Sequence, residues 1–182
     1  MKATLKTILI AGISTIAVFM AVLLPSCNRD KCKAIVCANG SVCETGVCVC
    51  PSGYEGDRCQ IVNRERFLGV WDVSEDGSIT DPATYAVGIE TGDNISEVRI
   101  KNMYNLLDER VNAFVKGDTI TIPQQIADNH TVVGKGYILR DENFGTYTKI
   151  VLRYSITNNG NNQTNYFGYL GAGQPSICIR QQ

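Results

Sequence analysis

The chain has 182 residues, eight cysteines and a formal net charge of −1. Its near-neutral charge and the shortness of its basic runs argue against a nucleic-acid partner, which would need clustered Lys and Arg. The length leaves room for more than one folded unit, and six of the cysteines fall in one short stretch.

Residues 1–26 have the composition of an export signal. A basic start and an apolar stretch, 8–24, precede Ser26 and Cys27, and this order is typical of a signal peptide. The tetrapeptide LPSC that ends at Cys27 resembles the lipobox of bacterial lipoproteins, which implies a covalent lipid, such as palmitate, on Cys27. An uncleaved membrane helix is the alternative, since about 18 apolar residues can just span a bilayer.

Residues 27–31 form a short tether. Four residues separate Cys27 from the next cysteine, and they reach at most roughly 14 Å when extended. Because lipid on Cys27 holds this point at a membrane, the following module would sit directly against it. We therefore expect a lipid-anchored protein of the bacterial cell envelope, in the outer membrane.

Residues 32–59 contain six cysteines and too little apolar material for a hydrophobic core, so disulfides must hold this module together in an oxidising compartment. Six cysteines allow fifteen pairings, and the sequence alone leaves them open. The spacing C-x4-C-x5-C-x4-C-x-C-x8-C, with Gly53, Tyr54 and Gly56 in its tail, resembles the epidermal growth factor-like (EGF-like) module.

This resemblance implies a disulfide pattern. The implied pairs are Cys32 with Cys43, Cys37 with Cys48, and Cys50 with Cys59. Each bridge closes a short loop and contributes roughly 3 kcal/mol in the chain-entropy model. No metal is expected, because His130 lies too far away to complete a zinc site, and Lys31 occupies a position where calcium-binding members carry an acid or amide.

Two cysteines remain outside the module, Cys27 and Cys178. If Cys27 carries lipid, Cys178 is an unpaired thiol in an oxidising space and must be buried. If it does not, the two can pair and join the ends of the mature chain. We favour a buried Cys178 in a C-terminal strand.

After a polar linker, 60–66, residues 67–182 have the character of a β domain. Ile150, Leu152, Tyr154 and Ile156 alternate with mainly polar residues, which is the period of a strand. Strands are predicted at 69–73, 85–89, 97–103, 111–115, 119–122, 131–139, 149–157, 166–170 and 176–180. Turn sequences lie between many of them, which predicts an antiparallel barrel or sandwich. The helical candidate, 106–110, is too short to matter.

This domain begins with Gly69 and Trp71 in the pattern G-x-W. The pattern resembles the start of lipocalin-like barrels, in which the tryptophan closes one end. Similar domains follow lipoprotein signals in many bacterial envelope proteins. An ordinary β-sandwich with a core tryptophan is the alternative.

No catalytic motif is apparent, so we expect a protein that is not an enzyme and needs no cofactor beyond the lipid on Cys27. His130 and the acids of Glu75-Asp76 and Asp108-Glu109 are expected in solvated turns. The leading hypothesis is a membrane-bound, non-catalytic module that binds a protein or a glycan. The second hypothesis is a carrier of a small apolar ligand inside the barrel, and the third is a hydrolase with an unrecognised acid pair.

Overall fold

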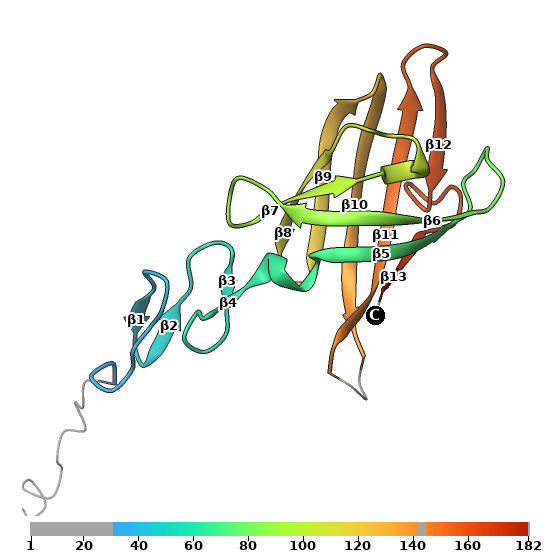
Figure 1. The fold of residues 1–182 in the computed structure, drawn as a ribbon. Coiled ribbons are helices and arrows are strands. Elements are labelled where there is room, and N and C mark those ends of the chain that lie inside the picture. Colours follow the sequence, from blue (N-terminus) through green and yellow to red (C-terminus); the bar gives the residue numbers. More distant parts are fainter. Residues whose placement is uncertain (1–30, 142–144, 182) are drawn as a thin grey trace, which may run out of the picture.

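The computed structural model describes residues 31–141 and 145–181 (Figure 1). The expected export signal, 1–26, and Cys27 lie outside the described residues. Two parts follow along the chain, a small disulfide-rich module and a closed antiparallel β-barrel of eight strands, so the predicted all-β class is confirmed. Within the described ranges no helix is long and apolar enough to cross a membrane.

The module consists of two small hairpins. β1 (Val42–Glu44) pairs with β2 (Val47–Val49), and β3 (Tyr54–Glu55) pairs with β4 (Ile61–Val62). Two disulfides, Cys32–Cys43 and Cys37–Cys48, join the segment before β1 to the first hairpin, and Cys50–Cys59 joins the end of that hairpin to the β3–β4 loop; these are the pairs that the EGF-like resemblance implies. Cys48 and Cys59 are its buried hydrophobic residues, so covalent bonds replace a core here.

Nine strands form the barrel domain, and each overlaps one of the nine predicted runs. They are β5 (Gly69–Glu75), β6 (Ala83–Thr91), β7 (Glu97–Lys101), β8 (Val111–Lys116), β9 (Thr119–Ala127), β10 (His130–Arg140), β11 (Tyr147–Asn158), β12 (Gln163–Phe167) and β13 (Ser176–Arg180). β5 to β11 form a meander, and β13 closes the barrel between β11 and β5. On the same edge of β11, β13 pairs with the first part of the strand (149–152) and β12 pairs with the last part (155–158).

Closure of the barrel depends on the long pairing of β10 with β11. Gly134 and Gly136 of β10 lie opposite Tyr154 and Leu152. A Cβ added at Gly136 would lie 2.6 Å from the Val151 carbonyl oxygen. Glycine therefore allows the two strands to approach closely where the sheet bends into a barrel.

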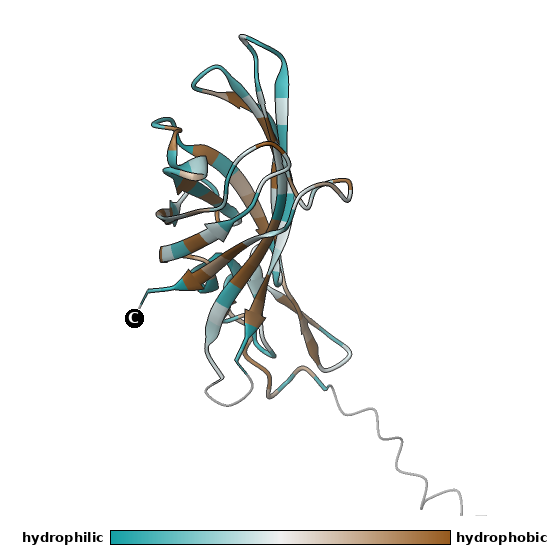
Figure 2. Cartoon of the chain, turned by 90° about the vertical axis from the view of Figure 1, so that its right-hand side faces the viewer, coloured by the Kyte–Doolittle hydropathy of each residue, from teal (hydrophilic) through white to brown (hydrophobic). Residues whose placement is uncertain are grey.

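The hydrophobic core fills the inside of the barrel. The predicted alternation in β11 is correct, because Ile150, Leu152, Tyr154 and Ile156 are all buried. Figure 2 shows apolar and polar segments alternating along the strands, as expected when one face points inward.

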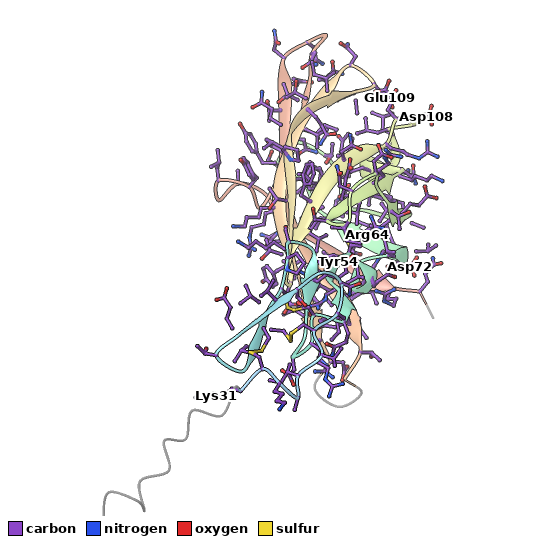
Figure 3. The ribbon with its side chains drawn as sticks, turned by 90° about the vertical axis from the view of Figure 1, so that its left-hand side faces the viewer. Lys31, Tyr54, Arg64, Asp72, Asp108 and Glu109 are labelled. Atoms are coloured by element: carbon purple, nitrogen blue, oxygen red, sulfur yellow. A yellow bond between two sulfur atoms is a disulfide. The ribbon has the colours of Figure 1, made fainter. Side chains whose placement is uncertain are left out.

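The barrel has two different ends. The connections β6–β7, β8–β9 and β10–β11 lie at one end, together with the disulfide module; we call this the stalk end (Figure 1). The connections β5–β6, β7–β8, β9–β10 and β11–β12 lie at the other end, which we call the mouth. In Figure 3, Lys31 marks the module, whereas Asp108 and Glu109 lie at the mouth.

Candidate binding site

The interior of the barrel leaves almost no free space. The cavity inside it measures about 20 Å³, roughly the room for one water. Its walls include Ile100, Met103 and Ile120, which are all buried. A small-molecule site normally needs about 300–1,000 Å³, so the interior does not accommodate such a ligand in this conformation.

The G-x-W residues lie at the stalk end. Gly69 has φ 124° and starts β5, and Trp71 is fully buried with its indole N–H donating to the Phe67 carbonyl at 2.8 Å. The Arg180 guanidinium lies 4.2 Å from the Trp71 ring centre. Arg180 also donates to the carbonyls of Leu68 at 2.7 Å and Tyr147 at 2.9 Å. These contacts hold Trp71 and the end of β13 together at the stalk end.

Glu75 corrects one expectation. β5 continues to this residue, so the alternation of Trp71 and Val73 places Glu75 inside the barrel rather than in a solvated turn. Its Oε2 accepts hydrogen bonds from the Tyr154 hydroxyl at 2.9 Å and the Ser176 hydroxyl at 3.2 Å. Burial raises the pKa of Glu75 above its ordinary value of 4.5, although these hydroxyls lower it.

The neighbouring acid, Asp76, is exposed. It lines a more open space of about 300 Å³ at the mouth end of the barrel, beside Pro82 of the β5–β6 connection and Pro175. Glu75 also contributes to the lining of this space, but its carboxylate is held inside the barrel by the Tyr154 and Ser176 hydroxyls, whereas Asp76 is exposed. This arrangement lacks the facing carboxylates of a glycosidase-type site.

Cys178 is a buried free thiol, with 4% of its surface exposed. It lies on β13 and lines the small interior cavity. Burial raises the pKa of the thiol to about 12. The thiolate is therefore strongly disfavoured, and Cys178 behaves as a small apolar core residue.

The mouth contains a pocket of about 230 Å³, which we call the mouth pocket. Residues of three mouth connections, β5–β6, β7–β8 and β11–β12, and of strands β10, β11 and β12 line it: Ile79, Thr80, Tyr104, Leu106, His130, Ile156, Asn158, Asn161, Gln163 and Asn165. The sequence pattern predicted Ile156 as a strand residue and His130 as a turn residue, and it assigned neither of them to a binding site. The signal that could have indicated the site is the density of amides around the β11–β12 turn.

A hydrogen-bonded amide forms the floor of the mouth pocket. Asn165 is buried, and its Oδ1 accepts from the Ile79 backbone N–H at 3.2 Å and the Ser78 hydroxyl at 3.4 Å. Its Nδ2 donates to Thr80 Oγ1 at 2.7 Å and to the Tyr104 hydroxyl at 3.4 Å. Asn165 therefore ties the β5–β6 and β7–β8 connections to β12.

The β7–β8 connection is held in an uncommon backbone conformation. Asn102, Tyr104 and Asn105 have φ values of 56°, 60° and 50°. Tyr104 belongs to the short 3-10 turn η2 (Met103–Asn105), and the predicted helical candidate 106–110 is not helical. Left-handed φ is unfavourable for a bulky residue and is often found at functional sites. Here it positions Tyr104 over the floor, where its ring packs edge-on against Phe167.

His130 is half-buried at the first position of β10, rather than in an open turn. Its Nδ1 lies 2.7 Å from the Asp128 carbonyl oxygen, which can only accept, so Nδ1 carries the hydrogen. In the neutral ring, Nε2 is then an acceptor. The backbone of His130 pairs with that of Asn158, which fixes the ring beside the amides of the β11–β12 turn.

The module is fixed to the stalk end through the segment predicted as a linker, 60–66. This segment contains β4 and the 3-10 turn η1 (Asn63–Arg66). Arg66 forms ion pairs with Glu55 of the module and Asp118 of the barrel, and its guanidinium lies 4.7 Å from the Tyr147 ring centre. The side chain of Arg66 is only 7% exposed. The segment is therefore a structured junction.

Two further contacts strengthen this junction. Arg64 Nη1 donates to the Asn94 carbonyl at 2.6 Å (Figure 3). Gly53 has φ 93°, and a Cβ there would lie 2.6 Å from the Ile95 side chain, so the β6–β7 loop packs closely on the module. Tyr54 and Gly56 lie in and just after β3, and Gly56 has φ 91°. Of these turn residues, Gly53 is the one that meets the barrel, whereas Gly56 lies against Gln60 of the junction.

In comparisons with known proteins, no family model and no curated protein matches the chain. Within the described ranges, no group of three or more His, Cys, Asp or Glu side chains is placed to hold a metal ion. The assignment of a function therefore depends on the geometry of the mouth pocket.

Proposed function

We propose that the chain is a lipid-anchored, non-catalytic binding protein of the bacterial envelope, in which an EGF-like stalk carries a lipocalin-like barrel. The contrast between the two spaces supports this proposal most directly. The interior cavity measures about 20 Å³, whereas the mouth pocket measures about 230 Å³ and opens to solvent. Binding would take place at the mouth.

The position of the module agrees with this role. The lipid on Cys27 would lie within about 14 Å of Lys31, and the module docks at the stalk end through Arg66. The mouth pocket lies at the opposite end of the barrel, so it would point away from an outer-membrane surface. A rigid junction keeps that direction fixed.

The alternatives have less support. A carrier of a small apolar ligand requires interior space of roughly 300 Å³ or more, and the core side chains occupy it. A hydrolase requires converging acids, and Glu75 and Asp76 lie in different environments.

The anchor is tested by intact-mass analysis of the full chain extracted from membranes, before and after reduction. A lipid adduct on Cys27 together with three disulfides is the expected result. An unmodified N-terminus with a fourth disulfide would instead indicate a secreted protein whose Cys27 and Cys178 are joined.

Binding is tested with the full chain in lipid nanodiscs, applied to arrays that carry glycans on some spots and surface proteins on others. We expect the protein to bind some of these spots. Leu106→Asp, at the mouth, should abolish this binding, and Leu139→Asp should leave it unchanged. Leu139 is a matched control, because it is also an exposed leucine but lies on the outer wall of β10. Finding no Leu106-dependent signal, or release of a cleaved product, would contradict the proposal.

A further inference from the structure

We infer that the mouth pocket binds the terminal ring of a neutral carbohydrate. This inference rests on the proposed binding function and adds the chemical class of the ligand. It depends on the charge of the pocket lining, on the hydrogen-bonding groups that point to no other described residue, and on the exposed apolar side chains beside them.

The lining of the mouth pocket is polar but uncharged. It contains four carboxamides, one threonine hydroxyl, one phenol and one imidazole, and no Asp, Glu, Lys or Arg side chain. A carboxamide both donates and accepts, as does each hydroxyl of a sugar. A charged ligand would leave its charge unpaired in this pocket, which is costly. The lining therefore favours a neutral ligand rich in hydroxyl groups.

Several side chains in the pocket have one polar atom in a hydrogen bond with the protein and a second polar atom that is available to a ligand. Asn158 Oδ1 accepts from the Gly160 backbone N–H at 2.8 Å, and Gln163 Oε1 accepts from Asn161 Nδ2 at 3.1 Å. Among the described residues, Asn158 Nδ2, Gln163 Nε2 and His130 Nε2 have no hydrogen-bond partner. The pocket thus offers two donors and one acceptor on preoriented side chains.

An apolar surface lies next to these groups. Ile79 and Leu106 are 56% and 57% exposed, and the Tyr104 ring is half-buried between the connections that carry them. One face of a sugar ring carries C–H groups that can cover such side chains, while its hydroxyls reach the amides. Burial of this apolar area adds to binding.

The size and the surroundings of the pocket further restrict the classes of carbohydrate that it can bind. At about 230 Å³, the pocket is smaller than the ~300–1,000 Å³ of typical drug-sized sites, which suits one ring rather than an oligosaccharide. Acids lie close to it in the chain, since Asp108 and Glu109 follow Leu106 in the β7–β8 connection (Figure 3) and Asp128, which is hydrogen-bonded to Glu109, precedes His130 by two residues. Sialic and uronic acids are therefore disfavoured.

The test is calorimetric titration of the full chain in nanodiscs. The probes are glucose, galactose, mannose and the two N-acetylhexosamines as methyl glycosides, with N-acetylneuraminic and glucuronic acids as anionic counterparts. We expect at least one neutral glycoside to bind and both acids to bind more weakly. Asn158→Asp and Gln163→Glu keep the fixed oxygen but replace the available donor, so each should weaken binding about three- to tenfold.

Asn112→Asp is the matched control, because Asn112 is exposed on the outside of β8 and the substitution adds the same charge. It should leave the affinity unchanged, and all three variants should unfold at the wild-type denaturant concentration. The inference is overturned if no neutral glycoside binds at millimolar concentration, if the acids bind better, or if Asn112→Asp is as damaging as Asn158→Asp. If no glycoside binds in the titration but protein spots on the arrays give a Leu106-dependent signal, the carbohydrate inference is wrong and the proposed binding function stands.

Discussion

Two carboxylates are buried in the described part of the chain, and they are stabilised differently. Glu97 Oε2 accepts from the backbone N–H groups of Asp93 and Asn94 at 3.1 and 3.2 Å, in a loop at the stalk end. Glu75 instead lies among hydroxyls inside the barrel. Hydroxyls can rotate to donate or to accept, so they also tolerate a protonated or neutral group. The fold therefore does not require the charge of Glu75.

The stability of the barrel should depend on pH through Glu75. The folded-state pKa is raised above 4.5, so the folded protein holds the proton more tightly than the unfolded chain. The contribution of Glu75 to stability is then fully present below about pH 4.5 and is lost as the pH rises through the folded-state pKa. Glu75→Gln removes the buried charge and should stabilise the protein at neutral pH by on the order of 1 kcal/mol.

Urea unfolding between pH 4 and 8, followed by the fluorescence of the single tryptophan, Trp71, checks this expectation. The variant should lack the wild-type loss of stability in this range. Glu75→Ala is the contrasting variant, because it leaves the Tyr154 and Ser176 hydroxyls unpartnered and should destabilise by about 1–3 kcal/mol. Equal pH profiles for wild type and Glu75→Gln would show that the carboxylate is not protonated preferentially in the fold.

Cys178 should be unreactive in the folded protein. Its burial and its pKa of about 12 leave almost no accessible thiolate at pH 8. We expect no labelling by a disulfide-exchange reagent under native conditions and one labelled thiol in guanidinium chloride, located by peptide mass analysis. Labelling of the native protein at the rate of a free small thiol would contradict the burial of Cys178.

At the scale of elements, the strands could be predicted because most of them have a local sequence pattern that is typical of a strand. Ile150, Leu152, Tyr154 and Ile156 alternate with mainly polar residues, and Gly69 and Trp71 mark the first strand. The choice of a barrel over a sandwich could not be made in this way, because it depends on the pairing of β13 with both β11 and β5. Pairings between distant strands leave no local signal.

The junction and the mouth pocket were missed for the same reason. Arg66 looks like a linker residue until Glu55 and Asp118 are brought to it from both sides. Asn165 looks like an ordinary strand amide until the β5–β6 and β7–β8 connections meet it. Apart from the Arg66–Glu55 pair, these contacts join residues more than fifty positions apart in the sequence.

The junction should loosen when Arg66 is replaced. Arg66→Met keeps most of the aliphatic length but removes the ion pairs with Glu55 and Asp118 and leaves both acids without this partner. We expect faster proteolysis within 60–66 and a loss of about 1–3 kcal/mol in unfolding free energy. Arg58→Met, at an exposed position in the module, is the control and should change neither quantity. A protease-resistant Arg66→Met protein would show that backbone contacts alone fix the junction.

At the scale of the whole molecule, two different mechanisms stabilise the two parts. The barrel buries a continuous cluster of apolar side chains that includes Trp71, Tyr154 and Phe167. The module has hardly any buried apolar residues and depends on three disulfides, each worth roughly 3 kcal/mol. The two parts should therefore respond differently to reduction.

Reduction should unfold the module and leave the barrel folded. Cys178 is already a free thiol, so no disulfide joins the described strands of the barrel, and its unfolding reported by Trp71 should shift by only about 1–2 kcal/mol, the value of the lost junction contacts. Hydrogen exchange of the full chain, with and without a reducing agent, measures both parts in one experiment. Backbone amides of β1 to β4 should lose protection, whereas those of β10 and β11 should keep it. Simultaneous loss of protection in both parts would mean that the barrel depends on the module to stay folded, and the junction would then be part of the barrel's folding unit.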